Sequence, residues 1–480
     1  MNSYQEFINT KEYTPVESGF EVPDDWLSPE FKPHQKVCTK WALKRGKSAL
    51  FLDTGLGKSI CLLNWASAVE RHTGAPVLIL APLAVAHQID AEAKKFNIKQ
   101  CVIGVSNGDF AEAKEAGLNI AESDSDVHED GVYITNYEKL DNFDASQFSG
   151  IVLDESSILK GFYGRVREQI TNAFKDTPYK LSTTATPSPN DFMELGTQSE
   201  FLGIMTQAEM LSMFFVNDTS ETNKWRLKGH GATKFWEWLS TWAIVLRKPS
   251  DLGFDNEGYD LPNLHFHEHI VETDALDGDM FVQVAQTLSE RAVARRDSVI
   301  PRCEKASDIA NSVDGKCLIW CDRNDESEML TKSIDSAVEV KGSDKPDHKK
   351  WALLGFAGDD VDKLVSKPSI AGYGMNYQSC NNMVFTGLSD SFEKFYQAVR
   401  RCWRFGQTEE VHVHIVSSDK EGAVLDNIKR KQKQHDDMSE KMVALMRELT
   451  LKQIDSKVSS KAKYNPTLDM TTPEWLISEE

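Results

Sequence analysis

Short apolar runs alternate with amphipathic stretches over most of the first 190 residues. Four of these runs are SALFLD at 48–53, PVLILAP at 76–82, GVYITNY at 131–137 and GIVLDES at 150–156, and the last two end in polar residues. Stretches with helical spacing accompany them, such as HQKVCTKWALKRG at 34–46 and SICLLNWASAVERH at 59–72. An alternation of buried strands with amphipathic helices predicts a parallel sheet with helices on both faces.

A second block with the same alternation begins near Lys316. Its apolar runs are KCLIWCD, KLVSKPS, NNMVFTGLS and EEVHVHIVSS, the last ending at Ser418. Between the two blocks, residues 192–265 are rich in Trp and Phe, as in FWEWLSTW and MFFV, and we interpret them as helical. The pattern therefore predicts an α/β protein in which two parallel-sheet domains lie in tandem, with a helical insertion lobe between them.

The same pattern sets the expected domain boundaries. Residues 1–25 show little periodicity and are expected to form a loose N-terminal arm. The first α/β domain is expected at 26–191, the helical insertion or linking lobe at 192–265 and the second α/β domain at 266–420. A C-terminal helix and tail follow at 421–480. No internal repeat with a period of 20–50 residues is visible.

Composition excludes some classes of protein and leaves others open. The chain has 480 residues, no apolar run long enough to span a membrane, and no basic start followed by an apolar core. Its eight widely spaced cysteines form no CxxC pair, so we expect reduced thiols in a cytosolic protein. A net charge of −20 is unusual for a nucleic-acid binder, although a basic groove can exist on an acidic body.

A glycine turn follows the first predicted strand, in FLDTGLGKSI at 51–60. Glycines there let backbone N–H groups close around phosphate oxygens, and the next helix adds its positive end. Lys58 would reach the β and γ phosphates, and the Ser59 hydroxyl would bind Mg²⁺. The alternative is an ordinary turn with a solvated lysine, and Leu52 replaces the leading glycine of the full pattern. The residues expected around the phosphates are Thr54, Gly55, Leu56, Gly57, Lys58 and Ser59.

A pair of carboxylates ends a later strand, at Asp154 and Glu155. In a nucleotide site one carboxylate holds Mg²⁺ and the next polarises the attacking water. The alternative is a loop cap. Because parallel strands bring their carboxyl ends to one edge of the sheet, the pair and the glycine turn are expected to lie together.

The third element is QAVRRCWRFGQ at 397–407, where Arg401 and Arg404 have i, i+3 spacing. We expect both on one face of a helix. Arginines from a second domain can neutralise charge on a transferring phosphoryl group. The alternative is a basic surface helix.

Together these motifs resemble the superfamily-two helicases, and within them the Swi/Snf-type DNA translocases, most closely the short bacteriophage and bacterial forms. The likeness covers roughly residues 28–430. Beyond the motifs above, the matching residues are Phe31 and Gln35, Pro82 and Glu92, Tyr137, Lys160, Thr184, Thr186, Pro187 and Asn190, Leu261 and Pro262, Gly372, Gly374 and Asn376, and Gln397 with Gln407.

The resemblance implies two RecA-like domains that hydrolyse ATP with Mg²⁺ in the cleft between them. Lys58, Asp154, Glu155, Arg401 and Arg404 would then be catalytic, with Ser59 and Asp154 holding the metal. Phe31 and Gln35 would bind adenine, and Gly374, Asn376 and Gln397 would complete the nucleotide site. DNA would be contacted through its backbone, with Lys94, Lys95 and the basic run at 428–434 as candidates. A bacterial or phage-infected cytosol would be the location.

Three departures from the family pattern are present. Motif II reads Asp-Glu-Ser-Ser, so Ser157 replaces a histidine. Asp53 stands where many relatives have Glu, and the tryptophan usual before motif VI is absent. An RNA helicase and an inactive ATP-binding scaffold for a nuclease or replication partner stay open as alternatives. No nuclease cluster is visible in the sequence, so any cleavage would need a partner.

Two further features are given ordinary interpretations. His265, His267 and His269 share one face of a predicted strand, and we favour an exposed strand face over a metal site because no fourth ligand is apparent. The aromatic residues at 235–242 have helical spacing, which favours packing over base stacking.

Overall fold

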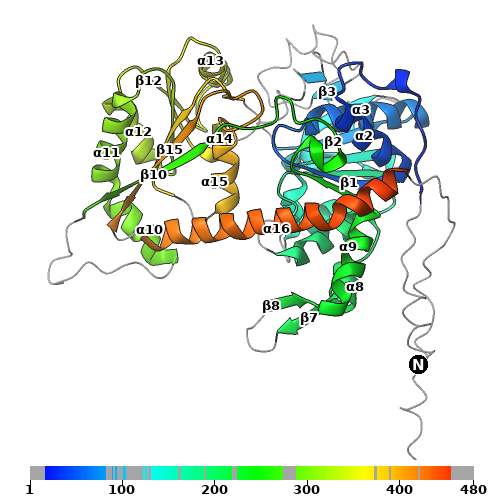
Figure 1. The fold of residues 1–480 in the computed structure, drawn as a ribbon. Helices are drawn as coiled ribbons and strands as arrows, with labels where there is room; N and C mark the ends of the chain where they lie inside the picture. Colours follow the sequence, from blue (N-terminus) through cyan, green and yellow to red (C-terminus); the bar gives the residue numbers. More distant parts are fainter. Residues whose placement is uncertain are drawn as a thin grey trace, which may run out of the picture.

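The computed structural model describes residues 17–82, 89, 92–93, 101–103, 123–124, 127, 131–160, 164–188, 191–218, 224–273, 288–371, 376–388, 391–419 and 422–455. Two lobes, each built on a parallel sheet, are joined by the segment 247–263 and by one long helix (Figure 1). In the described part of the chain, no helix is both long enough and apolar enough to cross a membrane.

The first lobe is built on seven parallel strands in the order β3-β4-β2-β5-β6-β1-β9. Their bounds are β1 (Lys47–Leu52), β2 (Val77–Ala81), β3 (Cys101–Ile103), β4 (Val132–Asn136), β5 (Gly150–Asp154), β6 (Tyr179–Thr183) and β9 (Ala243–Leu246). Neighbouring side chains on a strand point to opposite faces, so one strand feeds two cores. Leu50 and Leu52 pack with α2 (Pro33–Arg45) and α3 (Lys58–Thr73), whereas Phe51 packs on the opposite face.

The segment 192–265 differs from the expected helical lobe. It does contain α7 (Leu195–Leu202), α8 (Gln207–Phe214) and α9 (Ala232–Ser240), but also the hairpin β7 (Phe215–Asp218) and β8 (Lys224–Leu227). It also supplies β9, which pairs with β1 and completes the first sheet. The physical reason is the run AIVL, which is short, wholly apolar and buried, as expected of a parallel strand. The aromatic residues at 235–242 are mostly core, with Phe235, Trp238 and Trp242 nearly inaccessible.

The second lobe is built on six parallel strands in the order β10-β15-β14-β11-β13-β12. Their bounds are β10 (Leu264–Val271), β11 (Cys317–Cys321), β12 (Ala337–Val340), β13 (Lys363–Ser366), β14 (Asn382–Thr386) and β15 (Val411–Ser418). The helices of this lobe are α10 (Leu288–Asp297), α11 (Val299–Ser312), α12 (Asn324–Ser333), α13 (Pro346–Ala357), α14 (Pro368–Ala371) and α15 (Phe392–Val399). The α/β fold with two parallel-sheet lobes expected from the sequence is confirmed.

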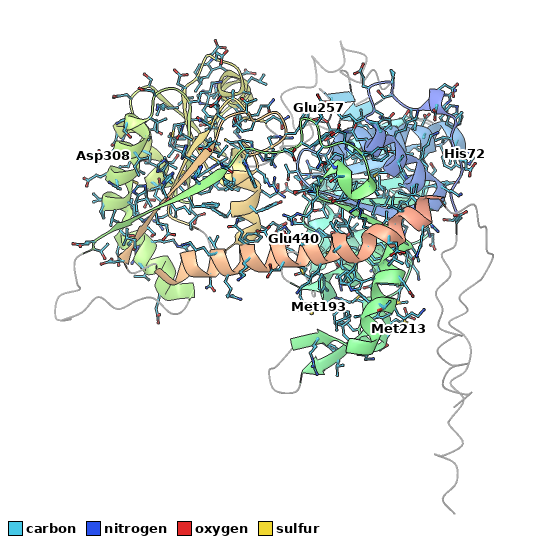
Figure 2. The ribbon with its side chains drawn as sticks, viewed as in Figure 1. His72, Met193, Met213, Glu257, Asp308 and Glu440 are labelled. Carbon is cyan, nitrogen blue, oxygen red and sulfur yellow. The ribbon has the colours of Figure 1, made fainter. Side chains whose placement is uncertain are left out.

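Helix α16 (Gly422–Asp455) starts on the second lobe and runs across to the first (Figure 1). Its first part contacts α15, and its later part packs against α9 and β9. Met442 and Met446 are buried in the core of the first lobe, together with Trp238 and Trp242. Figure 2 labels Glu257 on the connecting segment and Glu440 on α16, which mark the two crossings between the lobes.

The end of the expected N-terminal arm is also not loose. Phe20 stacks on His72 of α3 with ring centroids 3.7 Å apart, and the Phe20 backbone N–H donates to the Leu43 carbonyl. Val22 is buried against the same core. Residues 17–25 therefore belong to the first lobe, because the side chains of Phe20 and Val22 pack on its core although the segment has no periodic pattern. Residues 1–16 and the tail after Asp455 lie outside the described residues.

We expect the crossing of α16 to stabilise the first lobe measurably. Replacing Met446 with Ala removes a buried side chain and should lower the free energy of unfolding by about 2–4 kcal/mol, measured by urea denaturation. Leu445 is the matched control, because it is 49% exposed one residue away. Its change to Ala should cost about 0.5 kcal/mol or less. Equal losses in the two variants would mean that α16 does not dock in solution as described.

Candidate active site

Three neighbouring strands of the first sheet place their carboxyl ends side by side. In the order β5-β6-β1, the strands end at Asp154, Thr183 and Leu52. The loops that follow carry the glycine turn, the two carboxylates and the threonines of TTATP. Ligands of open parallel sheets bind at this edge. The sheet topology therefore brings together three segments, of which the first and the last are more than 100 residues apart in the sequence.

The glycine turn has the conformation that a phosphate loop requires. Gly55 and Gly57 have φ of 92° and 86°, values that a side chain disfavours. Lys58 begins α3, and its Nζ donates to the Leu52 carbonyl at 3.1 Å. Burial lowers the pKa of Lys58, while the carboxylates of Glu155, Asp53 and Asp154 oppose that shift. The ammonium group therefore faces the carboxylates across the mouth of the turn.

The two carboxylates after β5 have different surroundings. Asp154 is buried, and its Oδ1 accepts from Thr183 Oγ1 at 3.2 Å. Burial, followed by the charge of Glu155, raises the pKa of Asp154. A buried carboxylate whose negative charge is poorly compensated is well suited to bind a divalent cation. Within the described residues no cluster of three or more protein ligands could hold a metal alone, so Mg²⁺ would need water and phosphate oxygens as well.

Glu155 has a strained backbone. Its φ of 53° lies in the left-handed region, which costs a residue with a side chain about 1–3 kcal/mol. This conformation lets Glu155 Oε2 accept from Thr184 Oγ1 at 3.3 Å. Thr184 Oγ1 in turn accepts from the Thr186 backbone N–H at 3.1 Å. The second carboxylate is thus connected directly to the TTATP loop.

The second lobe brings motif VI to this edge, but not on a helix. Helix α15 ends at Val399, and residues 400–406 form successive turns. The prediction that Arg401 and Arg404 share one helical face is therefore wrong. The reason is that Arg401 N–H and Cys402 N–H donate to carbonyls only three residues back, which tightens the chain before Gly406, at φ 91°.

The two motif VI arginines have separate environments. Arg404 immediately precedes Phe405, which lies against Gly55 of the glycine turn, and the charge of Arg404 contributes to the lowered pKa of Lys58. Burial lowers the pKa of Arg404 to about 10; Arg401 adds to the shift, and Glu92 opposes it. Arg401 Nη2 instead donates to Gln397 Oε1 at 3.3 Å, and its carbonyl accepts from Tyr377 N–H at 2.9 Å. The segment that carries Arg404 therefore reaches the glycine turn, whereas Arg401 is buried and contacts Gln397 and Tyr377.

A contact that the sequence did not reveal joins the two lobes at the start of the turn. Arg400 Nη2 donates to Asp53 Oδ2 at 3.0 Å, and Tyr396 Oη donates to Asp53 Oδ1 at 2.8 Å. Lys160, the lysine after motif II, also forms an ion pair across the lobes, with Glu393 of α15. Only the tertiary fold shows these partners, because each pair is separated by more than 200 residues.

The residues expected to bind adenine lie beside the glycine turn. Gln35 is buried; its Nε2 donates to the Leu56 carbonyl at 3.0 Å and its Oε1 accepts from the Lys32 N–H at 3.0 Å. Phe31 is partly buried against the same core. Two aromatic residues not foreseen here are Tyr259 and Phe405, whose ring centroids are 4.7 Å apart.

Several other predicted residues can be placed, and some cannot. Ser59 follows Lys58 in the first turn of α3 and is partly buried, as is Thr54. Asn376 precedes β14, and its buried Oδ1 has no hydrogen-bond partner among the residues that the structure describes. Gly372, Gly374, Asn190, Lys94 and Lys95 lie outside the described residues. In the basic run, Lys429 of α16 forms an ion pair with Glu268.

The histidines of β10 form a ladder with those of β15. The strands pair in parallel, and His267 Nε2 lies 3.0 Å from His412 Nδ1. His269 Nε2 lies 3.1 Å from His414 Nδ1 in the next rung. The imidazoles thus hydrogen bond to one another. Partial burial and the neighbouring imidazoles lower the pKa of His414 to about 4.

Two known protein families match parts of this chain. The family described as SNF2-related domain matches residues 34–227, and the family described as helicase conserved C-terminal domain matches residues 302–406. No curated protein matches the chain significantly. Among solved structures, the Sulfolobus solfataricus SWI2/SNF2 ATPase core in complex with dsDNA is similar at 16% identity and a TM-score of 0.40; the match covers 93% of this chain and 99% of that chain. The two family matches fall on the two lobes in turn.

The strain at Glu155 predicts a trade-off between stability and catalysis. Glu155→Gly should raise the free energy of unfolding by about 1 kcal/mol, because glycine adopts a φ of 53° without strain. The same variant should lose most ATP turnover. Glu155→Gln is the control, since it removes the same charge beside Asp154 but keeps the strained backbone, so the glycine variant should be the more stable of the two. Thermal unfolding compares them, and a glycine variant less stable than the glutamine variant would contradict the argument.

Proposed function

Because the chain belongs to the Swi/Snf-type group of superfamily-two helicases, we propose that it is an ATP-dependent translocase that moves along or remodels duplex DNA. The family consists of nucleic-acid-stimulated ATPases with two lobes. The observation that carries the proposal is the approach of motif VI, from the second lobe, to the glycine turn of the first: a Cβ at Gly55 would lie 3.2 Å from the backbone nitrogen of Phe405, and Arg400 pairs with Asp53. A nucleotide bound at the glycine turn would therefore be touched from both lobes.

The residues around the turn can divide the work of hydrolysis. The N–H groups of the turn and Lys58 would bind the β and γ phosphates. Asp154 and Ser59 would hold Mg²⁺, which when bound offsets charge on the phosphate oxygens. Glu155 is placed to orient and deprotonate the attacking water, because its carboxylate lies beside that of Asp154 and is held by Thr184. Arg404 would stabilise charge on the transferring phosphoryl group.

Motion would follow from contacts that exist only when the lobes are together. Lys160 with Glu393, and Asp53 with Arg400, each join one lobe to the other. Binding of ATP would favour this closed form, and hydrolysis with release would favour opening. Thr184 lies between Glu155 and Thr186, so the state of the nucleotide can reach the loop beyond motif III.

A motor that accepts any sequence should bind DNA through its phosphates, so binding should weaken as salt rises. The net charge of −20 makes this a stringent test, because binding to phosphates requires positively charged side chains. The DNA-contacting residues among 94–95 and 428–434 stay predictions, and Lys429 is already paired with Glu268.

ATP turnover should be measured with no nucleic acid, single-stranded DNA, duplex DNA, branched DNA and RNA. We expect stimulation of about tenfold or more by DNA, and a loss of about 100-fold or more in Lys58→Ala, because the triphosphate loses its main cationic contact. Lys44→Ala is the control, since Lys44 lies on α2 and pairs with Glu21. Turnover that ignores every polymer would favour the scaffold, and stimulation by RNA alone would favour an RNA helicase.

A further inference from the structure

The ion pair between the lobes at Asp53 is more than a surface contact. The side chains of Arg400 and Asp53 are 7% and 14% exposed. Asp53 also accepts from Tyr396 Oη at 2.8 Å and from the Thr54 backbone N–H at 2.6 Å. Although burial opposes ionisation, the guanidinium of Arg400 holds the pKa of Asp53 below its usual value. A charged carboxylate thus begins the phosphate loop, and its counter-charge comes from the other lobe.

Arg400 is held in place by its own lobe. Its guanidinium lies 5.2 Å from the ring centroid of Tyr396 and 4.4 Å from that of Trp403. Trp403 Nε1 donates to the Pro262 carbonyl, at the end of the segment that connects the lobes. Tyr396 packs against His435 of α16, with ring centroids 5.1 Å apart. The two rings beside the Arg400 guanidinium therefore contact both the connecting segment and α16.

The three arginines of motif VI, at positions 400, 401 and 404, have different partners. Arg400 donates to Asp53, Arg401 donates to Gln397, and the charge of Glu92 opposes the lowering of the pKa of Arg404. Arg400 thus contacts the phosphate loop through the carboxylate of Asp53. A role for Arg400 in catalysis must accordingly act through Asp53.

We propose that Arg400 is a positioning residue, which neutralises Asp53 when the lobes close and so makes the phosphate loop fit to accept a triphosphate. This inference rests on the proposed function. The physical reason is Coulombic. An unpaired carboxylate at the first residue of the loop would repel the phosphates in a site shielded from water, where charges interact strongly. Since the counter-charge arrives with the second lobe, high nucleotide affinity is restricted to the closed form.

A charge-removal cycle tests the proposal. The affinity of a fluorescent non-hydrolysable ATP analogue is measured for the wild type, Arg400→Gln, Asp53→Asn and the double variant. Arg400→Gln should weaken binding about tenfold, because it leaves Asp53 unpaired. Asp53→Asn should not weaken it, and the double variant should bind within about threefold of the wild type. If Arg400 instead touched the phosphates, the double variant would stay as weak as Arg400→Gln, and the proposal would be overturned.

Two further variants guard against trivial outcomes. Tyr396→Phe removes only the hydroxyl donor to Asp53, keeps the packing on His435, and should weaken binding about twofold to threefold. A Tyr396→Phe protein that binds like the wild type would oppose the proposal even if Arg400→Gln failed to fold. Arg296→Gln with Asp297→Asn is the matched control, since this exposed pair lies on α10 and should change nothing.

The design separates failure of this inference from failure of the proposed function. Affinity for the analogue does not depend on turnover or on DNA. If the wild type hydrolysed no ATP with any polymer while the cycle was strongly non-additive, only the motor function would be lost. If DNA-stimulated turnover was present but the losses in affinity were additive, only the role of Arg400 would be lost.

Discussion

Charge balance inside a closed cleft is the constraint on which the remaining architecture depends. The strand ends of the first lobe gather Asp53, Asp154 and Glu155 around Lys58, so that lobe alone carries an excess of buried negative charge. The second lobe supplies Arg400 and Arg404 to the same place. When the lobes are together, neither the carboxylates nor the arginines are well solvated, so each group must be neutralised by the opposite charge. The fold of each lobe can be understood as the support that holds one half of this balance.

The sequence predicted the strands and their ends well, because buried parallel strands are continuous apolar runs that need no tertiary information. It predicted the edge of the sheet at which Lys58, Asp154 and Glu155 meet for the same reason. It failed where local spacing was not decisive. The spacing of Arg401 and Arg404 predicted a helix beyond Val399, although the helix ends there. The strand β9 was missed because its short run AIVL follows an aromatic segment with helical spacing. Arg400 was missed because its partner lies 347 residues away.

The departures from the family pattern acquire a physical meaning in this arrangement. Asp53 is one methylene shorter than the glutamate of many relatives, and it is met here by a guanidinium clamped between two aromatic rings. Ser157, in place of a histidine, is buried in the turn that follows the two carboxylates. The link from the nucleotide site toward motif III runs through Glu155 and Thr184. The strained backbone of Glu155 is what permits that link.

Helix α16 has a consequence for how the two lobes can move. The connecting segment and α16 both pass from one lobe to the other (Figure 1). Met442 and Met446 of α16 are buried in the core of the first lobe. Two bodies joined at a single point can tumble in every direction, but two bodies joined at two points can only rotate about the line through both. While both joints stay packed, the lobes therefore have one principal degree of freedom, and every cycle must retrace the same arc.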